Sequence, residues 1–376
     1  MSVLQKSQEL QKRQSAIAHR HEKLGAELVE WGGVGTAYDY TSQSTEDEHD
    51  AIRERVGVFD VTGLNKKWVE GTDAISVLNH ACVRDVSKLV DGQAGYTVLL
   101  TDEGTIHDDA IIYRFNAEKF LFVSGTGQAE KYLTLSANGK ECTVRIDDDV
   151  QDLAVQGPDA VKVIDAICDD DLTALGMFRH METTINGHEV IVSRTGFTGE
   201  RGYEIYCNYN ILEEIYDTVL EAGKPYDIMT TGFDCLDKVR IESALLFYPY
   251  DMDETTTIWE VGLDWTVPSN KSSEYRGRTA SELAKGKEKV HVVGIKIDHN
   301  DMVSDEAVLL SNGEKVGRIT SPVWSHRMKE SIALAQVNPG FNAIGTILEL
   351  KDADFKTTAT VSEIAFYDPE KKRLRG

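Results

Sequence analysis

Apolar and polar positions along the chain alternate between a strand-like and a helix-like period. In residues 66–82, a short strand ends at a glycine, and apolar residues then recur at i, i+3, i+4 and i+7, which indicates an amphipathic helix. The same order returns in residues 150–168, where Gly157-Pro158 separates an apolar run from a helical pattern. The polar, helical pattern of residues 3–30 predicts a further helix, which ends before Gly32-Gly33.

Several neighbouring strands are joined by short turns instead of helices. Residues 96–115 place apolar runs on both sides of Gly104, and residues 188–207 do the same around a turn with three glycines. Antiparallel neighbours need only such short turns, whereas parallel neighbours need long crossovers. We therefore expect mixed sheets in an α+β fold.

The pattern changes near residue 285. After the lysine- and glycine-bearing stretch 284–289, short strands are separated by turn signals such as Asn312-Gly313, without helical periods between them. This spacing predicts a small closed or nearly closed β domain. We place one region at residues 1–285 and the β domain at residues 286–376.

Composition narrows the class of partner. The formal net charge of −23 argues against a nucleic-acid partner, which needs clustered Lys and Arg. Five widely spaced cysteines without a C-x-x-C pair fit reduced thiols better than disulfides or a zinc site. The sequence has no apolar run long enough to predict a membrane span, and its start lacks the apolar region of a secretory signal. We expect a small molecule or a basic patch on another protein as the partner, and a cytoplasmic location.

The stretch TDEGTIHDDAIIYRF (101–115) places two adjacent aspartates, Asp108 and Asp109, before an apolar run. Charged residues are disfavoured inside strands unless they face water or a ligand. A metal site is the weakest interpretation, because EF-hand spacing and an H-E-x-x-H motif are both missing. A charged hairpin edge and a carboxylate aimed at a substrate both stay open. Strand alternation lets only one of the pair serve a given site.

The stretch RTGFTGERGYEIY (194–206) combines three glycines with aromatic rings and a glutamate. A phosphate cradle is weakly supported, because a P-loop pattern is missing and no helix is expected directly after it. In another interpretation the loop approaches a flat ligand, with Phe197 and Tyr203 as ring faces and Glu204 accepting two N–H donors. A hairpin turn with a surface glutamate explains the same residues without a ligand.

Together these stretches resemble the glycine cleavage T-protein family. The family comprises folate-dependent aminomethyltransferases and their demethylase relatives, such as dimethylsulfoniopropionate demethylase. The resemblance runs in sequence order from about residue 30 to about residue 370. The matching segments are GVFDVTG (57–63), DVSKLVDGQAGYTVLLTDEGTIHDDAIIYR (85–114), LAVQGPDA (153–160), RTGFTGERGYEIY (194–206), VRIESAL (239–245), DMDET (251–255), and GRITSPVWS with SIALAQV (317–337).

The resemblance implies a three-lobed α+β fold, in which two interleaved lobes and a C-terminal β-barrel surround a central hole that holds tetrahydrofolate. It places Asp108 beside the folate nitrogens as the catalytic residue, and Asp109 then points away. Glu204 matches the glutamate that grips the pterin. The other cofactor-binding residues that it implies are Tyr96, Phe197, Tyr206 and Arg240.

Three segments depart from the aminomethyltransferase pattern. Cys235-Leu236-Asp237 stands where the family typically has Ala-Arg-Asp, and a leucine cannot replace an anion-binding arginine. Thr62-Gly63-Leu64 replaces Ser-His-Met, and Thr320-Ser321-Pro322 replaces Thr-Ser-Gly. We interpret these changes as a sign that the one-carbon donor is not the lipoyl-bound aminomethyl group.

The first hypothesis is a tetrahydrofolate-dependent demethylase or methyltransferase that takes a methyl group from a small methylated compound. Trp31, Tyr38 and Trp259 are candidates to box an onium methyl by cation–π contacts, although each ring also fits an ordinary core or surface position. The second hypothesis is an aminomethyltransferase that works with a lipoyl carrier protein. A folate-binding module without turnover and a flavin-linked oxidase fragment are disfavoured, because their K-G-C-Y-x-G-Q and G-x-G-x-x-G motifs are missing.

Overall fold

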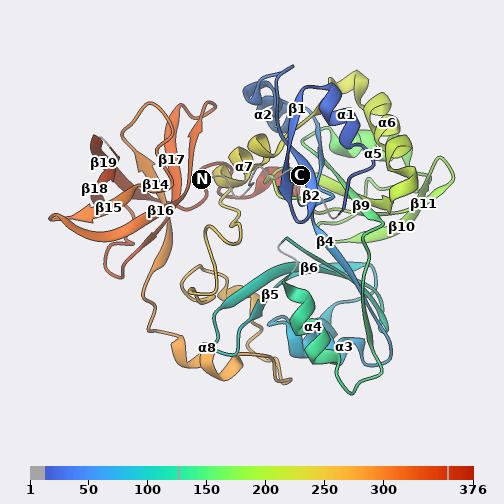
Figure 1. The fold of residues 1–376 in the computed structure, drawn as a ribbon, viewed down its shortest axis with the longest axis horizontal. Coiled ribbons are helices and arrows are strands. Elements are labelled where there is room, and N and C mark those ends of the chain that lie inside the picture. The colour runs from blue at the N-terminus through green and yellow to red at the C-terminus, as the bar shows by residue number, and fades with distance from the viewer. Residues whose placement is uncertain (1–12, 126–127, 354) are drawn as a thin grey trace.

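The computed structural model describes residues 13–125, 128–353 and 355–376, which form three lobes (Figure 1). A six-stranded sheet and a five-stranded sheet, each with its own helices, make up two lobes, and a closed six-stranded barrel forms the third. The α+β fold with a C-terminal β-barrel that the sequence predicts is confirmed.

The six-stranded sheet has the strand order β10-β11-β12-β9-β3-β13. Its neighbours pair antiparallel, except for β3 and β13, which are parallel. Apolar residues of α5 and α6 pack on one face of this sheet and form its core. The bounds are β3 Gly57–Asp60, β9 Val150–Gln156, β10 His180–Ile185, β11 His188–Ser193, β12 Gly202–Asn208, β13 Met229–Thr230, α5 Ala160–Ile167 and α6 Leu212–Gly223.

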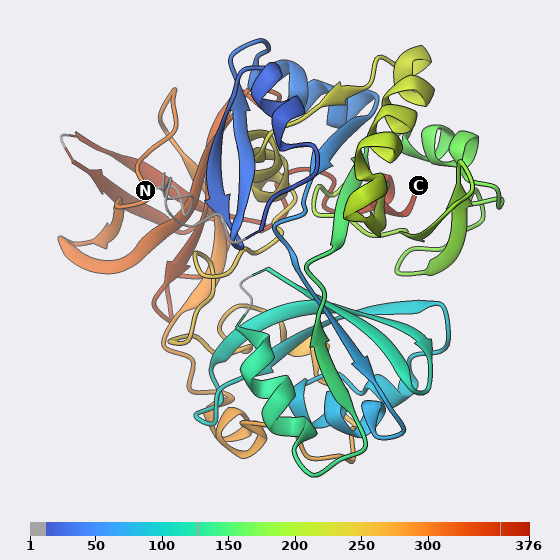
Figure 2. The same cartoon turned by 45° about the vertical axis from the view of Figure 1, so that its right-hand side comes forward.

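The five-stranded lobe is inserted between β3 and β9. The chain enters it at β4 and leaves it at β8, and these two strands lie side by side (Figure 2). The strand order is β5-β6-β7-β4-β8, and α3 and α4 cover one face. The bounds are β4 Asn65–Glu70, β5 Gln93–Leu100, β6 Ile106–Asn116, β7 Lys119–Ser124, β8 Thr143–Ile146, α3 Ala74–Ala81 and α4 Ala129–Ala137.

The barrel closes in the order β14-β17-β16-β15-β18-β19. The predicted turn at Asn312-Gly313 joins β15 to β16, and both residues have positive φ (52° and 83°), as a two-residue hairpin turn requires. The bounds are β14 His291–Ile297, β15 Val308–Ser311, β16 Glu314–Ser325, β17 Glu330–Val337, β18 Ile347–Asp352 and β19 Phe355–Ser362.

Further helices complete the body, and one of them contacts the barrel. In α2, the Ser44 hydroxyl accepts the backbone N–H of Asp47 at 3.1 Å, which caps the helix start. α7 packs against α2 and against β16 of the barrel, so it lies where the body meets the barrel (Figure 1). The bounds are α2 Thr45–Glu54, α7 Phe233–Glu242, α8 Arg278–Ala284 and α9 Lys372–Arg375.

The helix predicted over residues 3–30 is wrong over most of its described length. α1 spans only Ala18–Lys23, and β1 (Ala26–Trp31) pairs antiparallel with β2 (Val34–Tyr40). Gly32 and Gly33 turn the chain with φ of 59° and 84°, so hairpin pairing overrides the helical pattern. Residues 3–12 lie outside the described part.

All five cysteines are free thiols, in agreement with the sequence. Among the described residues, no helix combines the length and the apolar character that crossing a membrane demands.

Candidate functional site

The side chains of the two aspartates lie on opposite faces of β6. Ala110 packs in the core under α3 and α4, and Asp108 shares that face because side chains alternate along a strand. Tyr113 lies on the other face, where it packs with Tyr206 of the six-stranded sheet. Asp109 therefore lies on the face between the two sheets.

Asp108 is fully buried and bound to backbone groups. Its Oδ2 accepts the N–H of Ala129, the first residue of α4, at 3.1 Å, and its Oδ1 accepts the N–H of Asp109 at 2.9 Å. A buried lysine, Lys67, faces this carboxylate electrostatically. Burial lowers the pKa of Lys67 to about 8, and the charge of Asp108 opposes that shift. These contacts fit a role for Asp108 in holding the start of α4.

Asp109 is only partly buried, and a tyrosine hydroxyl binds its carboxylate. Its Oδ2 accepts the hydroxyl of Tyr96 at 2.9 Å. The ring of Tyr96 in turn stacks on Trp265, whose side chain is exposed, at a centroid distance of 5.8 Å. Burial, followed by the negative charge of Asp108, raises the pKa of Asp109 to about 7. Such a carboxyl group can take up or release a proton at neutral pH.

The catalytic role expected for Asp108 stays a prediction, and the geometry favours Asp109 for that role. The sequence argument that only one of the pair serves the site is compatible with this arrangement. The expectation placed Asp108 in the interlobe space, whereas the packing of β6 places Asp109 there.

Glu204 lies on β12 with a cluster of hydroxyl groups around one of its oxygens. Its Oε2 accepts hydrogen bonds from Thr195 at 2.5 Å, from Tyr206 at 2.7 Å and from Tyr113 at 3.0 Å. Within the described residues, Oε1 accepts none. Three neutral donors hold the carboxylate in one orientation, and Oε1 is left to accept N–H groups of a ligand.

A second carboxyl group, Asp152, lies behind Glu204, and the sequence analysis missed it. Asp152 is fully buried, and neither of its oxygens has a hydrogen-bond partner among the described residues. Burial, followed by the charge of Glu204, raises the pKa of Asp152 well above its usual range. Burial likewise lowers the pKa of the nearby Lys66 to about 8. The only sequence signal was a charged residue inside the apolar run 150–156.

The other expected cofactor-binding residues have different surroundings. Tyr96 and Tyr206 contact the two carboxylates, as described above. Phe197 is partly buried, and its ring lies 6.1 Å from that of Phe247. Arg240 is 1 % exposed and donates to Asp237 at 2.7 Å, to Asp251 at 2.6 Å and to Ser321 at 2.9 Å. Arg240 thus joins α7 to the barrel, and its cofactor contact stays a prediction.

The three rings expected to bind substrate do not pack together. Trp31 and Tyr38 belong to one apolar cluster with Phe233, whereas Trp259 packs in another and donates to the carbonyl of Ser281 at 2.8 Å. Their role in binding a methylated substrate stays a prediction.

Trp31 explains one departure from the family pattern. A Cβ atom built on Gly63 would lie 2.3 Å from Cε3 of Trp31. The indole therefore fills the space that a side chain at position 63 would need.

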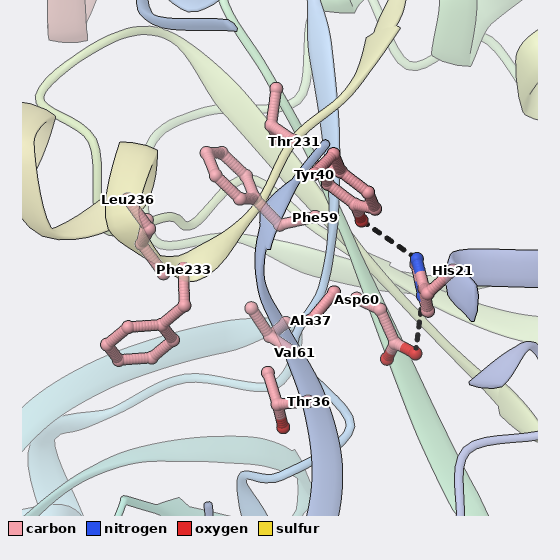
Figure 3. A pocket seen from close by; sticks show the side chains of 10 residues that line it. All are labelled: His21, Thr36, Ala37, Tyr40, Phe59, Asp60, Val61, Thr231, Phe233 and Leu236. Atoms are coloured by element: carbon pink, nitrogen blue, oxygen red, sulfur yellow. Dashed lines mark hydrogen bonds and ion pairs between the residues drawn. The ribbon is translucent and has the colours of Figure 1, made fainter. Parts of the chain in front are cut away.

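Leu236 faces a small cavity in the body, together with Phe233 (Figure 3). The cavity measures about 10 Å³, the space of a single water molecule, and is too small for a pterin. On its other side, His21 joins the hydroxyl of Tyr40 at 2.8 Å to the carboxylate of Asp60 at 3.2 Å. Leu236 itself packs in an apolar cluster with Phe59, Val61 and Phe233.

The interlobe face offers a flat heterocycle two carboxylates with different properties. Glu204 provides a fixed acceptor, and Asp109 provides a group that titrates near neutral pH. Asp109 and Tyr113, which contacts Glu204, are four residues apart on one strand, so their Cα atoms are about 13 Å apart. These residues fit a reduced pterin, which carries N–H donors at one end and reactive nitrogens at the other.

Comparisons with known proteins agree with this architecture. The family described as the GCVT N-terminal domain matches residues 17–271, and the glycine cleavage T-protein C-terminal barrel domain matches residues 291–368. A heme-dependent oxidative N-demethylase gamma subunit from Ectopseudomonas mendocina (strain ymp) is 38% identical over 96% of this chain and 97% of its own. An aminomethyltransferase from Geobacillus sp. (strain WCH70) is 31% identical over 92% of this chain and 96% of its own. The crystal structure of glycine cleavage system aminomethyltransferase T from Bartonella henselae superposes with a TM-score of 0.87 at 26% identity, covering 95% of this chain and 98% of that one.

Proposed function

This chain belongs to the glycine cleavage T-protein family, and from that premise we propose that it transfers a one-carbon group from a small N-methylated donor to tetrahydrofolate. The observation that carries the proposal is the pair of Glu204 and Asp109 on one interlobe face, each oriented by a tyrosine hydroxyl. Bound tetrahydrofolate supplies the nucleophilic nitrogen that receives the carbon.

The chain's own residues bind the pterin and move a proton. Glu204 accepts the pterin N–H groups through Oε1, because its Oε2 is saturated by Thr195, Tyr206 and Tyr113. When the bond between the methyl carbon and the nitrogen of a cationic donor breaks, its electron pair stays on the donor nitrogen, which leaves as a neutral amine. Asp109 takes the proton that the receiving nitrogen loses, and Tyr96 orients its carboxylate. Fixing the two reactants in this way replaces a bimolecular encounter by a positioned one, which lowers the barrier by several kcal/mol.

Two observations support an N-methylated donor. The relative from Ectopseudomonas mendocina is named as a subunit of an oxidative N-demethylase, and it covers almost the whole chain. Two positions that depart from the aminomethyltransferase pattern lie in tightly packed surroundings. Trp31 fills the space beside Gly63, and Leu236 packs with Phe233. A cationic N-methyl donor is also favoured electrostatically beside Asp109. Because that relative is a gamma subunit, we extend the proposal to action beside other subunits.

Aminomethyl transfer is the second candidate. It is favoured by the whole-chain similarity to aminomethyltransferases in sequence and in structure. That reaction would release ammonia and give 5,10-methylene-tetrahydrofolate with a lipoyl carrier protein as donor.

A product assay separates the two candidates. The protein is incubated with tetrahydrofolate and a panel of N-, S- and O-methylated compounds, and the folate products and ammonia are measured. We expect folate to gain a carbon from an N-methylated compound without release of ammonia. Carbon transfer from none of the panel, together with ammonia release from an aminomethylated carrier, would overturn the proposal in favour of the second candidate.

A further inference from the structure

Two histidines and an aspartate meet where the body contacts the barrel. His49 and Asp50 lie on α2, and His326 follows the end of β16. Asp50 and His326 are 276 positions apart in sequence, and the sequence analysis did not single out any of the three. Their meeting is a product of the tertiary fold.

The ligand atoms of these residues have the spacing of a metal shell. Nδ1 of His49 lies 3.3 Å from Oδ1 of Asp50, and Nε2 of His326 lies 3.0 Å from the same oxygen. One ligand atom from each residue lies within 4.8 Å of the other two. Ligands at about 2.1 Å from a tetrahedral zinc ion are about 3.4 Å apart from each other. The three side chains therefore need only small adjustments to share one ion.

The second ring nitrogen of His49 lies against a carboxylate, as it does in many metal-bound histidines. Its Nε2 lies 3.0 Å from both carboxylate oxygens of Glu242. Glu242 in turn accepts hydrogen bonds from Ser325 at 2.6 Å and from Arg53 at 2.7 Å, so its charge is paired. When Nε2 donates to this carboxylate, Nδ1 of a neutral imidazole carries the lone pair that faces Asp50. A carboxylate behind the imidazole is a recurrent outer shell of zinc sites.

The remaining surroundings allow an ion to enter. The His49 side chain is 1% exposed, whereas those of His326 and Asp50 are 19% and 44% exposed, so one wall of the group is open to solvent. The nearby cation, Arg327, lies 4.0 Å from Asp50 but only 2.9 Å from Glu54. Its charge is thus engaged mainly by Glu54.

We propose that His49, Asp50 and His326 bind a divalent transition-metal ion of the zinc type, which clips the barrel to the body. Two imidazoles and one carboxylate suit zinc, and three protein ligands leave a fourth position for water. The ion ties α2 to the turn after β16 and stabilises the folded chain by binding to it. This site is independent of the folate chemistry proposed above.

The test uses the full-length protein after removal of metals by a chelator. Zn²⁺ alone is titrated calorimetrically, Co²⁺ is added to record visible absorption, and thermal unfolding is followed with and without Zn²⁺. His326→Ala removes the most accessible imidazole, and Asp50→Asn removes the shared carboxylate. His188→Ala is the matched control, because His188 also pairs with a single carboxylate, that of Glu214, at 3.2 Å on the surface.

We expect one equivalent of Zn²⁺ per chain, a four-coordinate Co²⁺ spectrum and a higher unfolding temperature with Zn²⁺. His326→Ala should lose saturable binding and the thermal shift, while its unfolding temperature without metal stays close to that of the wild type. His188→Ala should keep both. The proposal is overturned if the wild-type chain binds no stoichiometric Zn²⁺, or if His326→Ala and Asp50→Asn bind it as tightly as the wild type.

Discussion

The carboxyl group of Asp109 predicts the pH dependence of the reaction. Its pKa is raised to about 7 by burial and then by the charge of Asp108. Because the deprotonated form accepts the proton, kcat/KM should rise as pH increases through about 7 and level off above it. Asp109→Asn should remove this limb and most of the activity at every pH. A flat profile between pH 5 and 9 in the wild type would argue against proton transfer to Asp109.

The neighbouring aspartate gives a second, opposite prediction. Asp108→Asn removes a negative charge beside Asp109, so the limb should move to lower pH, with the plateau largely kept. The full pH profile of the purified variant, with circular dichroism to check folding, measures this. If Asp108→Asn abolishes turnover while Asp109→Asn retains it, the catalytic role returns to Asp108, as the sequence first indicated.

At the level of secondary structure, the contacts of Arg240 join α7 to the barrel, and we expect them to contribute strongly to the free energy of unfolding. It pairs with the buried Asp251 at 2.6 Å, and Asp251 also accepts the hydroxyls of Thr320 at 2.5 Å and Ser321 at 2.8 Å. Removing one partner of a buried pair costs about 3–5 kcal/mol. Arg240→Ala should lower the free energy of unfolding by that amount in urea titrations, and a double-mutant cycle with Asp251→Ala should reveal coupling.

A surface lysine provides the control for this prediction. Lys356 pairs with Glu349 at 2.7 Å, and both side chains are exposed; such pairs contribute about 0–1 kcal/mol. Lys356→Ala should therefore change the free energy of unfolding little. If the two variants lose the same stability, Arg240 does not hold α7 to the barrel. A direct contact with the cofactor then becomes the better explanation for an arginine at this position.

The sequence predicted elements better than it predicted their faces. The spacing of Ala74, Val77, Leu78 and Ala81 gave the buried side of α3, because that signal is local. Which face of β6 meets the other sheet depends on the packing of a distant lobe, so the roles of Asp108 and Asp109 could not be assigned from alternation alone. β1 was missed because its pairing with β2 outweighs the helical pattern of residues 26–31.

The same reason decides which residues of the candidate site the sequence indicates. Glu204 stands in a contiguous motif and could be singled out from it, and in the structure it lies beside Tyr206 and Tyr113; its role in the site stays a prediction. Asp152 was missed because an isolated charge in a strand gives no local indication of a neighbour on another strand. The cluster of His49, Asp50 and His326 depends on contacts between lobes and has no contiguous signal.

For the whole molecule, the packing around Gly63 and Leu236 predicts that the three-lobed body does not accept a lipoyl-bound aminomethyl donor. With no basic side chain at position 236, we expect no ammonia above background when the protein is given an aminomethylated lipoyl carrier and tetrahydrofolate. An authentic aminomethyltransferase in the same assay provides the positive control. Leu236→Arg is not expected to create the activity, because Trp31 still fills the space beside Gly63. Ammonia released by the unmodified chain would contradict the choice of donor while leaving the folate site in place.

The central claim is that the face between the two sheets binds tetrahydrofolate through Glu204, and calorimetric titration of tetrahydrofolate tests it most directly. The wild-type chain should bind one equivalent. Glu204→Ala should bind about ten- to a hundred-fold more weakly, since a charge-assisted hydrogen bond contributes about 1.5–3 kcal/mol. Glu189→Gln, on the exposed side of β11, should bind like the wild type. Unchanged affinity in Glu204→Ala, or no binding by the wild type, would contradict the account.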